Sequence, residues 1–327
     1  MRRHAALVAL LLLVVTLAGT AVAAPLGRVP SIGITVSDAS RAAEFYATVL
    51  GFARVSDVEV TGPGLDALTG LANVRVRVVT MRLFDETLEL TQYLTPVGRP
   101  MPAGSRSHDH WFQHVAIIVS DMDEAYRWLR ERGVQGTSPE PQRLPDWNPS
   151  AGGIRAYYFK DPDGHALEIL QFPAGKGDPR WQRAYGRLFL GIDHTAIVVG
   201  DTERSLRFYR DLLGMTVVGR SENYGPEQER LNDVAGARLR ITTLRAASGI
   251  AVELLDYRTP RDGRAMAADA RANDLVAWHV TLVTDDADAA ARRLGGRIAS
   301  MADGALGFRR AFTVRDPDGH AVRVIGP

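Results

Sequence analysis

Cysteine is absent from this sequence of 327 residues. Its absence excludes disulfide bonds, thiolate metal ligands, cysteine nucleophiles and a lipidated N-terminal cysteine. Any bound metal ion must therefore be held by histidine, carboxylate and water. A large excess of one charge is absent too, because 39 Lys and Arg residues accompany 38 Asp and Glu residues. Without a strongly basic surface, nucleic acid is not expected as a partner.

Long hydrophobic runs are scarce, and the longest lies near the N-terminus. It extends from Ala5 to Ala18, follows two arginines and precedes the small residues Ala21-Val22-Ala23. This run is shorter than the roughly 20 residues that span a bilayer. We therefore predict a cleavable export signal over residues 1–23 rather than a membrane anchor. Removal of Arg2 and Arg3 changes the formal charge from +1 to −1, and the mature protein is expected in the periplasm or outside the cell.

Repetition organises the rest of the chain, whose overall content of 46% hydrophobic and 24% charged residues is typical of folded protein. Phe45–Phe52 recurs as Phe208–Met215, and the hexapeptide Asp161–Ala166 returns unchanged as Asp316–Ala321. We predict two related domains, residues 28–172 and 188–327. Residues 173–187 between them contain Pro, Gly and charged residues without periodicity, which is typical of a linker.

Each half divides again into two units. Four times, a short apolar strand runs into a polar cap and an amphipathic helix that ends at glycine. Further strand-like runs follow each helix. The pattern therefore predicts a β-α-β-β-β unit, repeated four times. The four opening strands are expected at residues 32–36, 114–119, 194–199 and 279–283.

These motifs resemble the vicinal oxygen chelate superfamily. The similarity is carried by Phe-Tyr-x-x-x-Leu-Gly in each half, by Thr87–Thr91, and by Asp-Pro-Asp-Gly-His-x-x-Glu before a last strand. That superfamily contains glyoxalase I, methylmalonyl-CoA epimerase, extradiol dioxygenases, and bleomycin- and fosfomycin-resistance proteins. The resemblance covers Val29 to Ile325. It implies an α+β fold in which four units pair into two cup-shaped, curled mixed sheets, with helices on the outer faces and a divalent metal at the base.

The resemblance also implies where metal ligands belong, on the first and last strand of each unit. A serine hydroxyl is a poor ligand and a guanidinium has no free lone pair, so two of the eight positions are unsuitable. Unit by unit, the positions are Ser31 and Glu89, His114 and Glu168, His194 and Glu253, and His279 and Arg323.

Two pairings of the units are possible. If each half closes on itself, both cups contain one unsuitable residue. If units two and three pair instead, as the resemblance to single-chain double glyoxalases permits, one cup receives His114, Glu168, His194 and Glu253. The other receives Ser31, Glu89, His279 and Arg323 as a degenerate second site. We favour this exchanged pairing because it leaves one ligand set complete.

The environment of the two glutamates supports a metal independently of the resemblance. Glu168 and Glu253 each lie amid aliphatic residues on a predicted strand. A buried carboxylate needs a cation, hydrogen-bond donors or a proton. One divalent ion shared with His114 and His194 would meet this need, and a mixed nitrogen and oxygen set suits Zn, Ni, Co, Mn or Fe. Alternatively, a histidine on a strand is simply a hydrogen-bonded structural residue.

Such a site favours lyase or isomerase chemistry on a small oxygenated substrate. The metal would act as a Lewis acid that stabilises an enediolate, and Glu168 or Glu253 would act as general base. An extradiol-type Fe(II) dioxygenase using His114, His194 and Glu168 is one alternative. A non-catalytic drug-binding or resistance protein is another. Export argues against the glutathione adduct used by glyoxalase I, because that adduct forms in the cytoplasm.

Several further residues attract attention. The loops with Trp147-Asn148 and Asn223-Tyr224 combine an aromatic with an amide, which predicts either substrate contacts or self-packing surface loops. The aspartates of the repeated hexapeptide, Asp161, Asp163, Asp316 and Asp318, are expected to form turns. His165 and His320 beside them are then expected at the surface. The expected partner is a small molecule rather than a membrane, and a monomer suffices because four units complete two cups.

Overall fold

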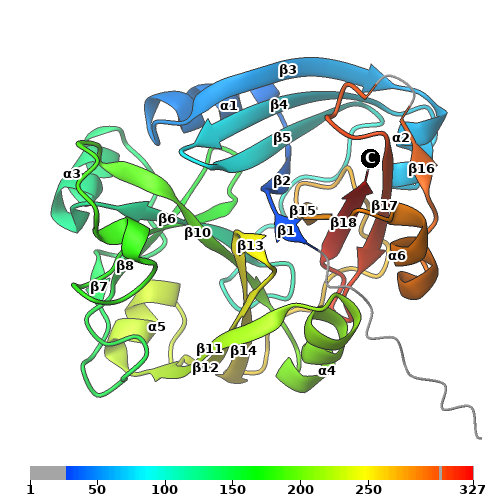
Figure 1. Ribbon diagram of the computed structural model, residues 1–327. Helices are drawn as coiled ribbons and strands as arrows, with labels where there is room; N and C mark the ends of the chain where they lie inside the picture. The colour runs from blue at the N-terminus through cyan, green and yellow to red at the C-terminus, as the bar shows by residue number, and fades with distance from the viewer. Residues whose placement is uncertain (1–26, 302–303, 327) are drawn as a thin grey trace, which may run out of the picture.

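The computed structural model describes residues 27–301 and 304–326. The predicted export signal, residues 1–23, lies outside these ranges. Among the described residues, no helix has both the length and the apolar character needed to cross a membrane. Two curled mixed sheets with helices at the periphery make up the fold, which confirms the predicted α+β class (Figure 1).

Units one and four build the first sheet, which we name cup 1–4. Its strand order is β16-β17-β18-β15-β2-β5-β4-β3, so the two units meet at β2 and β15, which run antiparallel. The short strand β1 pairs with both β15 and β13. The strands are β1 (Arg28–Val29), β2 (Ser31–Val36), β3 (Ala53–Thr61), β4 (Arg75–Leu83), β5 (Glu86–Thr95), β13 (Ser248–Gly249), β15 (Trp278–Val283), β16 (Ala299–Ser300), β17 (Arg310–Arg315) and β18 (Ala321–Gly326).

Units two and three build the second sheet, which we name cup 2–3. Its strand order is β11-β12-β14-β10-β6-β9-β8-β7, and the two units meet at the antiparallel pair β6 and β10. The strands are β6 (Gln113–Val119), β7 (Gln142–Arg143), β8 (Arg155–Lys160), β9 (Ala166–Gln171), β10 (Phe189–Val198), β11 (Thr216–Tyr224), β12 (Arg238–Arg245) and β14 (Ala251–Thr259).

The units therefore pair across the two halves of the sequence, and the exchanged arrangement is confirmed. Within every unit the first strand runs parallel to the last, as β2 does with β5 and β6 with β9. A parallel pair needs a long crossover, which the helix and middle strands of the unit supply. In Figure 1, β3, β4 and β5 lie along the top of the molecule, and β11, β12 and β14 lie along the bottom.

Each unit contains a helix whose N-cap is an aspartate. The cap lies at the predicted place in units one to three, and one residue after the predicted Thr284-Asp285 in unit four. The cap carboxylate accepts backbone N–H groups that the first turn leaves without a helical partner. In unit three, helix α4 continues into a π-helical segment, η2. The caps are Asp38, Asp121, Asp201 and Asp286, before α1 (Ala39–Thr48), α3 (Met122–Glu131), α4 (Thr202–Leu206) with η2 (Arg207–Leu212), and α6 (Ala287–Leu294).

Two additional helices each bridge the two units within one cup. Helix α2 (Pro63–Thr69) of unit one contacts β16 and β17 of unit four. Helix α5 (Pro226–Asn232) of unit three contacts β7 and β8 of unit two. Each helix thus connects the two units of its own cup at a place where their strands are not paired. The sequence analysis did not predict them.

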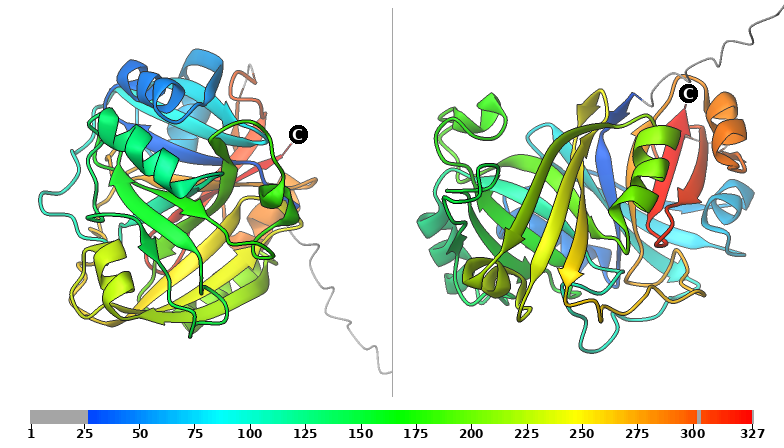
Figure 2. Two further views of the ribbon diagram at one scale, coloured as in Figure 1. Left: turned by 90° about the vertical axis from the view of Figure 1, so that its left-hand side faces the viewer. Right: turned by 90° about the horizontal axis from the view of Figure 1, so that it is seen from below.

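The largest hydrophobic cluster contains residues from all four units, among them Tyr46, Tyr157, Tyr209 and Phe312. A polar contact crosses the same region, where Trp128 Nε1 of unit two donates to the carbonyl oxygen of Val49 in unit one at 2.8 Å. Apolar burial is the main favourable contribution to folding. The shared core therefore stabilises the two cups together. Figure 2 shows the two sheets from two further directions.

The repeated Asp-Pro-Asp-Gly-His segments form turns, as predicted. Asp161 accepts hydrogen bonds from the backbone N–H of Asp163 and of His165, both at 2.9 Å. Asp316 does the same for Asp318 and His320.

The predicted surface position of the two histidines is wrong, because His165 and His320 are 1% and 5% exposed. His165 Nδ1 lies 2.9 Å from Asp161 Oδ2, and its Nε2 lies 2.8 Å from the carbonyl oxygen of Leu275. The turn of unit two also contacts unit one, where Asp163 accepts from the backbone N–H of Ser37 at 2.8 Å. The turns lie between the cups, and this position buries their histidines.

Candidate metal centre

The predicted ligands of cup 2–3 lie on four neighbouring strands, in the order β14-β10-β6-β9. Pairing places Glu168 and His194 on either side of Ala116. It likewise places His114 and Glu253 on either side of Ala196. Residues two apart on a strand share a face, so all four side chains project into the cup. The small alanine side chains leave room between them.

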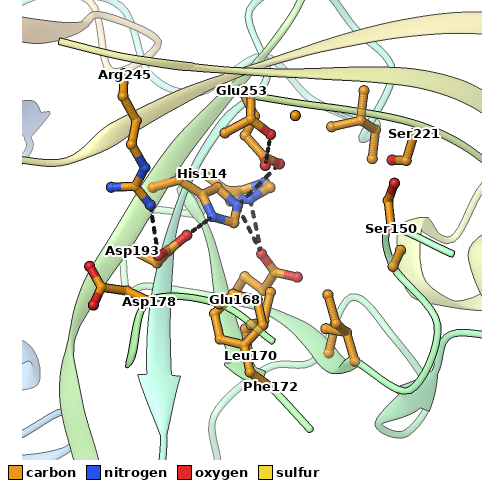
Figure 3. A pocket seen from close by; sticks show the side chains of 18 of the residues that line it. His114, Ser150, Glu168, Leu170, Phe172, Asp178, Asp193, Ser221, Arg245 and Glu253 are labelled. Atoms are coloured by element: carbon orange, nitrogen blue, oxygen red, sulfur yellow. Dashed lines mark hydrogen bonds and ion pairs between the residues drawn. The ribbon is translucent and has the colours of Figure 1, made fainter. Parts of the chain in front are cut away.

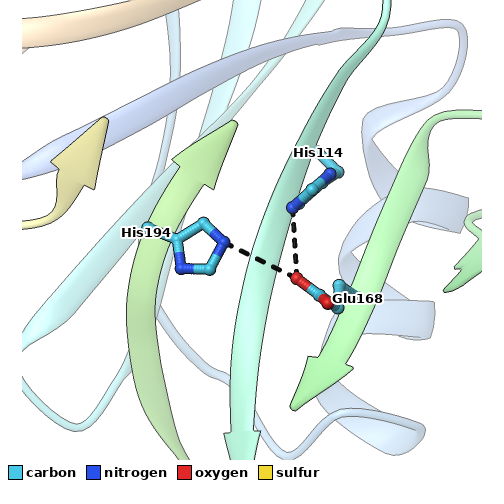
Figure 4. Close-up of side chains that lie close together, drawn as sticks. All are labelled: His114, Glu168 and His194. Atoms are coloured by element: carbon cyan, nitrogen blue, oxygen red, sulfur yellow. Dashed lines mark ion pairs between the residues drawn. The ribbon is translucent and has the colours of Figure 1, made fainter. Parts of the chain in front are cut away.

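The side chains converge closely. His114 Nε2 lies 3.2 Å from Glu168 Oε2, and His194 Nε2 lies 3.6 Å from the same oxygen (Figure 4). His194 Nε2 also lies 3.4 Å from Glu253 Oε2. Glu253 is steadied by Thr243, whose hydroxyl donates to Oε1 at 2.7 Å. The structure thus brings all four predicted side chains together, and the ligand atoms of His114, Glu168 and His194 lie within 4.8 Å of one another.

The donor set fits a divalent metal ion. Nδ1 of His114 is buried without a hydrogen-bond partner among the residues described. A buried polar atom in that state costs about 1–3 kcal/mol. The other ring nitrogen, Nε2, faces the carboxylate of Glu168. Two imidazole nitrogens and two carboxylates around one space are donors that transition metals accept.

The histidines and glutamates of this centre strongly affect one another's pKa values. Burial alone would raise the pKa of Glu168, but the imidazoles of His114 and His194 lower it to about 2. Burial would lower the pKa of His194, but the carboxylates of Glu253, Asp193 and Glu168 raise it well above its ordinary value. A metal ion would have to displace protons here, so metal binding is expected to be linked to pH.

A cavity of about 910 Å³ opens onto these residues (Figure 3). Its volume falls in the range that accommodates small organic ligands. One part of its lining is apolar and another is charged. The apolar part includes Leu144, Ile154, Tyr158, Leu170 and Phe172, and the charged part includes Arg28, Glu86, Asp178, Arg180, Asp193, Arg220 and Arg245.

Of the four predicted substrate contacts, Asn223 lines the cavity, whereas Trp147, Asn148 and Tyr224 are not among its lining residues. Asn148 lies behind Asn223, with its Nδ2 donating to Asn223 Oδ1 at 2.8 Å. The rings of Trp147 and Tyr224 contact each other with centroids 4.4 Å apart, and both remain about half exposed. These contacts join the loop after β7 to the end of the edge strand β11, which contains Asn223 and Tyr224 where the sequence predicted a loop.

The sequence analysis missed several residues around the centre. Asp193 directly precedes His194 and lies 3.0 Å from its Nδ1. The predicted linker contains the short helix η1 (Pro179–Gln182), and its residues Asp178 and Arg180 line the cavity. The carboxylate beside a histidine was a visible signal in the sequence. The predicted linker, in contrast, has no periodic pattern that would have identified it as part of a cavity wall.

The four side chains of the second set also meet, in cup 1–4. Ser31 Oγ donates to Glu89 Oε1 at 2.6 Å, and Arg323 donates to Glu89 Oε2 at 3.2 Å. His279 Nε2 lies 3.6 Å from the same oxygen. Burial would raise the pKa of Glu89, but His279, Arg323 and Ser31 lower it to about 2. The guanidinium therefore supplies within the chain the positive charge that this carboxylate needs.

Comparisons with other proteins agree with this arrangement of strands. The model of the Glyoxalase/Bleomycin resistance protein/Dioxygenase superfamily matches residues 28–169 and 191–324. Glyoxalase I from Zea mays is similar in structure, with 19% identity, a TM-score of 0.57, and 91% of this chain and 92% of that chain covered. A Bacillus subtilis protein provisionally named a dioxygenase has 16% identity and a TM-score of 0.56, with 92% and 85% covered. Both likenesses concern the fold alone. A comparison with curated proteins finds no match.

Proposed function

Because the chain belongs to the Glyoxalase/Bleomycin resistance protein/Dioxygenase superfamily, we propose that it is a metal-dependent, glyoxalase-like lyase or isomerase. The observation that carries the proposal is the convergence of two histidines and two glutamates at the base of a cavity. His114, Glu168, His194 and Glu253 would hold one divalent ion of the Zn, Ni, Co, Mn or Fe class.

When bound, the ion would supply the Lewis-acid charge that polarises a substrate carbonyl. We assign the role of general base to Glu253, which would remove a proton from the carbon beside that carbonyl. Its side chain is 18% exposed, against 5% for Glu168. Glu168 lies close to both imidazoles, whereas Glu253 lies close to that of His194. Glu253 is therefore the carboxylate with more freedom to accept a proton.

The cavity supports a small oxygenated organic substrate. Its apolar lining, with Leu170 and Phe172, suits a hydrocarbon body and excludes water from the base. Arg245 and Arg220 in the charged part of the lining suit polar or anionic substituents. A substrate of this class would present its carbonyl and neighbouring hydroxyl oxygens to the ion that the four side chains would hold.

One observation favours a second candidate, an extradiol-type Fe(II) dioxygenase. The tightest group is His114, Glu168 and His194, with Glu253 outside it. Two histidines and one carboxylate with open positions are the set used by non-haem Fe(II) oxygenases. Glu253 would then act beside the ion instead of binding it.

Metal analysis of the mature protein tests the site. We expect one stoichiometric ion in the wild type, its loss in His114→Ala and His194→Ala, and its retention in His279→Ala. Failure of the wild-type protein to bind any divalent ion, under every loading condition tried, would contradict the proposal.

Two reactions separate the candidate functions. Exchange of a solvent proton into an α-hydroxy carbonyl compound without O₂ supports the isomerase, and this exchange should stop in Glu253→Gln. Uptake of O₂ with catechols after anaerobic Fe(II) loading supports the dioxygenase. Tight binding of a drug by metal-free protein, with neither reaction, would instead favour a resistance protein.

We further propose that the protein works outside the cytoplasm, on the basis of the sequence of residues 1–23. Sequencing of the N-terminus of the mature protein from fractionated cells tests this. A start at residue 24 or 25 in the periplasmic or secreted fraction is expected. Recovery of the uncleaved chain in the cytoplasm would contradict it and would return the glutathione adduct to the possible substrates.

A further inference from the structure

The carboxylate of Asp193 is held between His194 and two fixed donors. Its Oδ2 lies 3.0 Å from His194 Nδ1. Its Oδ1 accepts from Trp181 Nε1 at 3.0 Å and from Arg245 at 3.2 Å. Asp193 and His194 are 6% and 5% exposed. The carboxylate is thus buried, saturated and oriented (Figure 3).

An irregularity in β10 makes this contact possible. Successive side chains of a regular strand point to opposite faces, so Asp193 would normally point away from the ring of His194. The pairing of β10 with β6 shifts between Ile192 and His194, which inserts one extra residue. Such a bulge redirects a side chain, and bulges often occur beside active sites.

Neighbouring contacts hold the irregularity in place. Glu86 Oε2 accepts from the backbone N–H of Ile192 at 3.1 Å, and Arg180 donates to Glu86 Oε1 at 2.6 Å. A Cβ on Gly191 would come within 2.6 Å of Glu86 Oε2 and 2.8 Å of the Trp181 ring. Only glycine allows this approach.

The other units offer no equivalent carboxylate. The residue before His114 is Gln113, whose Nε2 donates to Thr195 Oγ1 at 2.9 Å. The residue before His279 is Trp278. His114 Nδ1 has no hydrogen-bond partner among the described residues. His194 is therefore the histidine of the centre whose outer nitrogen is fixed by a carboxylate.

We propose that Asp193 is a positioning residue that holds the Nδ1–H of His194 and so directs Nε2 toward the place where a metal ion would bind. A carboxylate can only accept here, so Nδ1 must donate. The Nε2 atom faces Glu168 and Glu253, at 3.6 and 3.4 Å. Partners of this kind orient a ligand histidine and increase its basicity. The consequence for metal binding rests on the proposed function, whereas the position of the proton does not.

Replacement of Asp193 by asparagine should reverse the arrangement. Trp181 and Arg245 both donate toward the Oδ1 position, so the amide oxygen must face them. The amide N–H₂ then faces His194 Nδ1, which must accept. With Nδ1 as the acceptor, the ring proton must stay on Nε2, so the lone pair that would bind a metal ion is not available. Asparagine should therefore be worse than alanine, although it is the closer copy in shape.

NMR of histidine-labelled, metal-free protein tests the position of the proton. We expect His194 Nδ1 to be protonated in the wild type and unprotonated in Asp193→Asn. Asp178→Asn removes a carboxylate from the same cavity without touching a histidine, and it should leave the wild-type pattern. A protonated Nδ1 in Asp193→Asn would overturn the inference.

Titration with Co(II), followed by visible absorption, tests the consequence. We expect affinity to fall in the order wild type, Asp193→Ala, Asp193→Asn, with losses of about 10–100-fold, as for other outer partners of ligand histidines. A purely structural role predicts the opposite order of the two variants, and that result would overturn the inference. Absence of Co(II) binding by the wild type would count against the proposed function only, since the NMR result decides the position of the proton separately.

Discussion

The two cups share one strand arrangement but balance the charge of their buried glutamates in different ways. Pairing places Arg323 opposite Thr281 in cup 1–4, as it places Glu253 opposite Ala196 in cup 2–3. Cup 1–4 therefore has a permanent cation where cup 2–3 has a second carboxylate. The carboxylate of cup 1–4 is thus neutralised by Arg323 of the same cup. The two carboxylates of cup 2–3 need protons or a metal ion instead.

Space differs as well as charge. In cup 1–4, Gly33 takes the place of Ala116, and a Cβ on it would overlap the imidazole of His279. The ring of Phe308 lies over the guanidinium of Arg323 in this cup, with its centroid 6.0 Å away. In cup 2–3 the corresponding region opens into the cavity of about 910 Å³. Filled space and an internal cation suit a structural role, whereas the open cavity suits a substrate.

Replacement of equivalent histidines by alanine tests whether the two cups differ in metal binding. This replacement should give the largest effect. We expect His194→Ala to weaken metal binding by more than about 100-fold, beyond the range for residues that only support a ligand. His279→Ala, the equivalent change in cup 1–4, should leave affinity unchanged. Calorimetric titration with Zn(II) measures both. Equal losses in the two variants would mean that the cups do not differ as described.

Removal of the internal cation should destabilise cup 1–4. Arg323→Met leaves Glu89 buried with Ser31 and His279 as its remaining partners, and loss of one member of a buried ion pair costs about 3–5 kcal/mol. Urea unfolding of the metal-free protein measures this. Arg238→Met is the control, because its ion pair with Glu222 is exposed and such pairs contribute at most about 1 kcal/mol. A loss no greater than that of the control would refute the charge-balancing role.

The bridging helices provide a third contrast. A Cβ on Gly64 of α2 would overlap the carbonyl oxygen of Ser300 on β16. Gly64→Ala should therefore cost about 1–3 kcal/mol of unfolding free energy, as overpacking does. Glu227 holds the equivalent position in α5, after the Gly-Pro that begins each helix, and Glu227→Ala should change stability by less than about 0.5 kcal/mol. Thermal unfolding of the two variants gives the comparison.

The buried turns between the cups should add a pH dependence. Burial would lower the pKa of His165, but the carboxylate of Asp161 and the carbonyl of Leu275 raise it. A folded pKa above the unfolded value, about 6.5, gives stability that is present below that value and lost as pH rises through the folded pKa.

His165→Gln should therefore lose less stability than the wild type as pH rises from 6.5, although it is less stable at pH 6. The difference between the two unfolding free energies, measured at several pH values, cancels other titrating groups. A difference that stays constant with pH would contradict the expectation. We expect this to be the smallest of the four effects.

Much of the architecture followed from repeated local patterns. The units, the aspartate caps of the first three helices and the turn-forming role of Asp161 depend on residues close in sequence, so the sequence displays them. The exchanged pairing was inferred from the unsuitable ligands Ser31 and Arg323, and the strand order confirms it. The inference succeeded because both unsuitable residues lie in cup 1–4, which leaves the four ligands of cup 2–3 complete.

Other features depended on contacts between distant segments. His165 was placed at the surface, because a polar turn usually lies there and its partner Leu275 is 110 residues away. The bulge at Asp193 depends on the pairing of β10 with β6, which no periodic pattern reports. The cavity wall formed by residues 173–187 was likewise hidden in a segment that resembles a simple linker.

The sequence by itself determined the four units, their helix starts and the chemical types of the eight side chains at the cup bases. Only the tertiary structure decided which units share a sheet, which carboxylate supports His194, and where space remains for a ligand. The physical reason is the separation in sequence of the residues that interact. Helix caps and turns are formed by hydrogen bonds within a few residues, whereas strand register, burial and cavities arise when segments far apart in the chain come into contact.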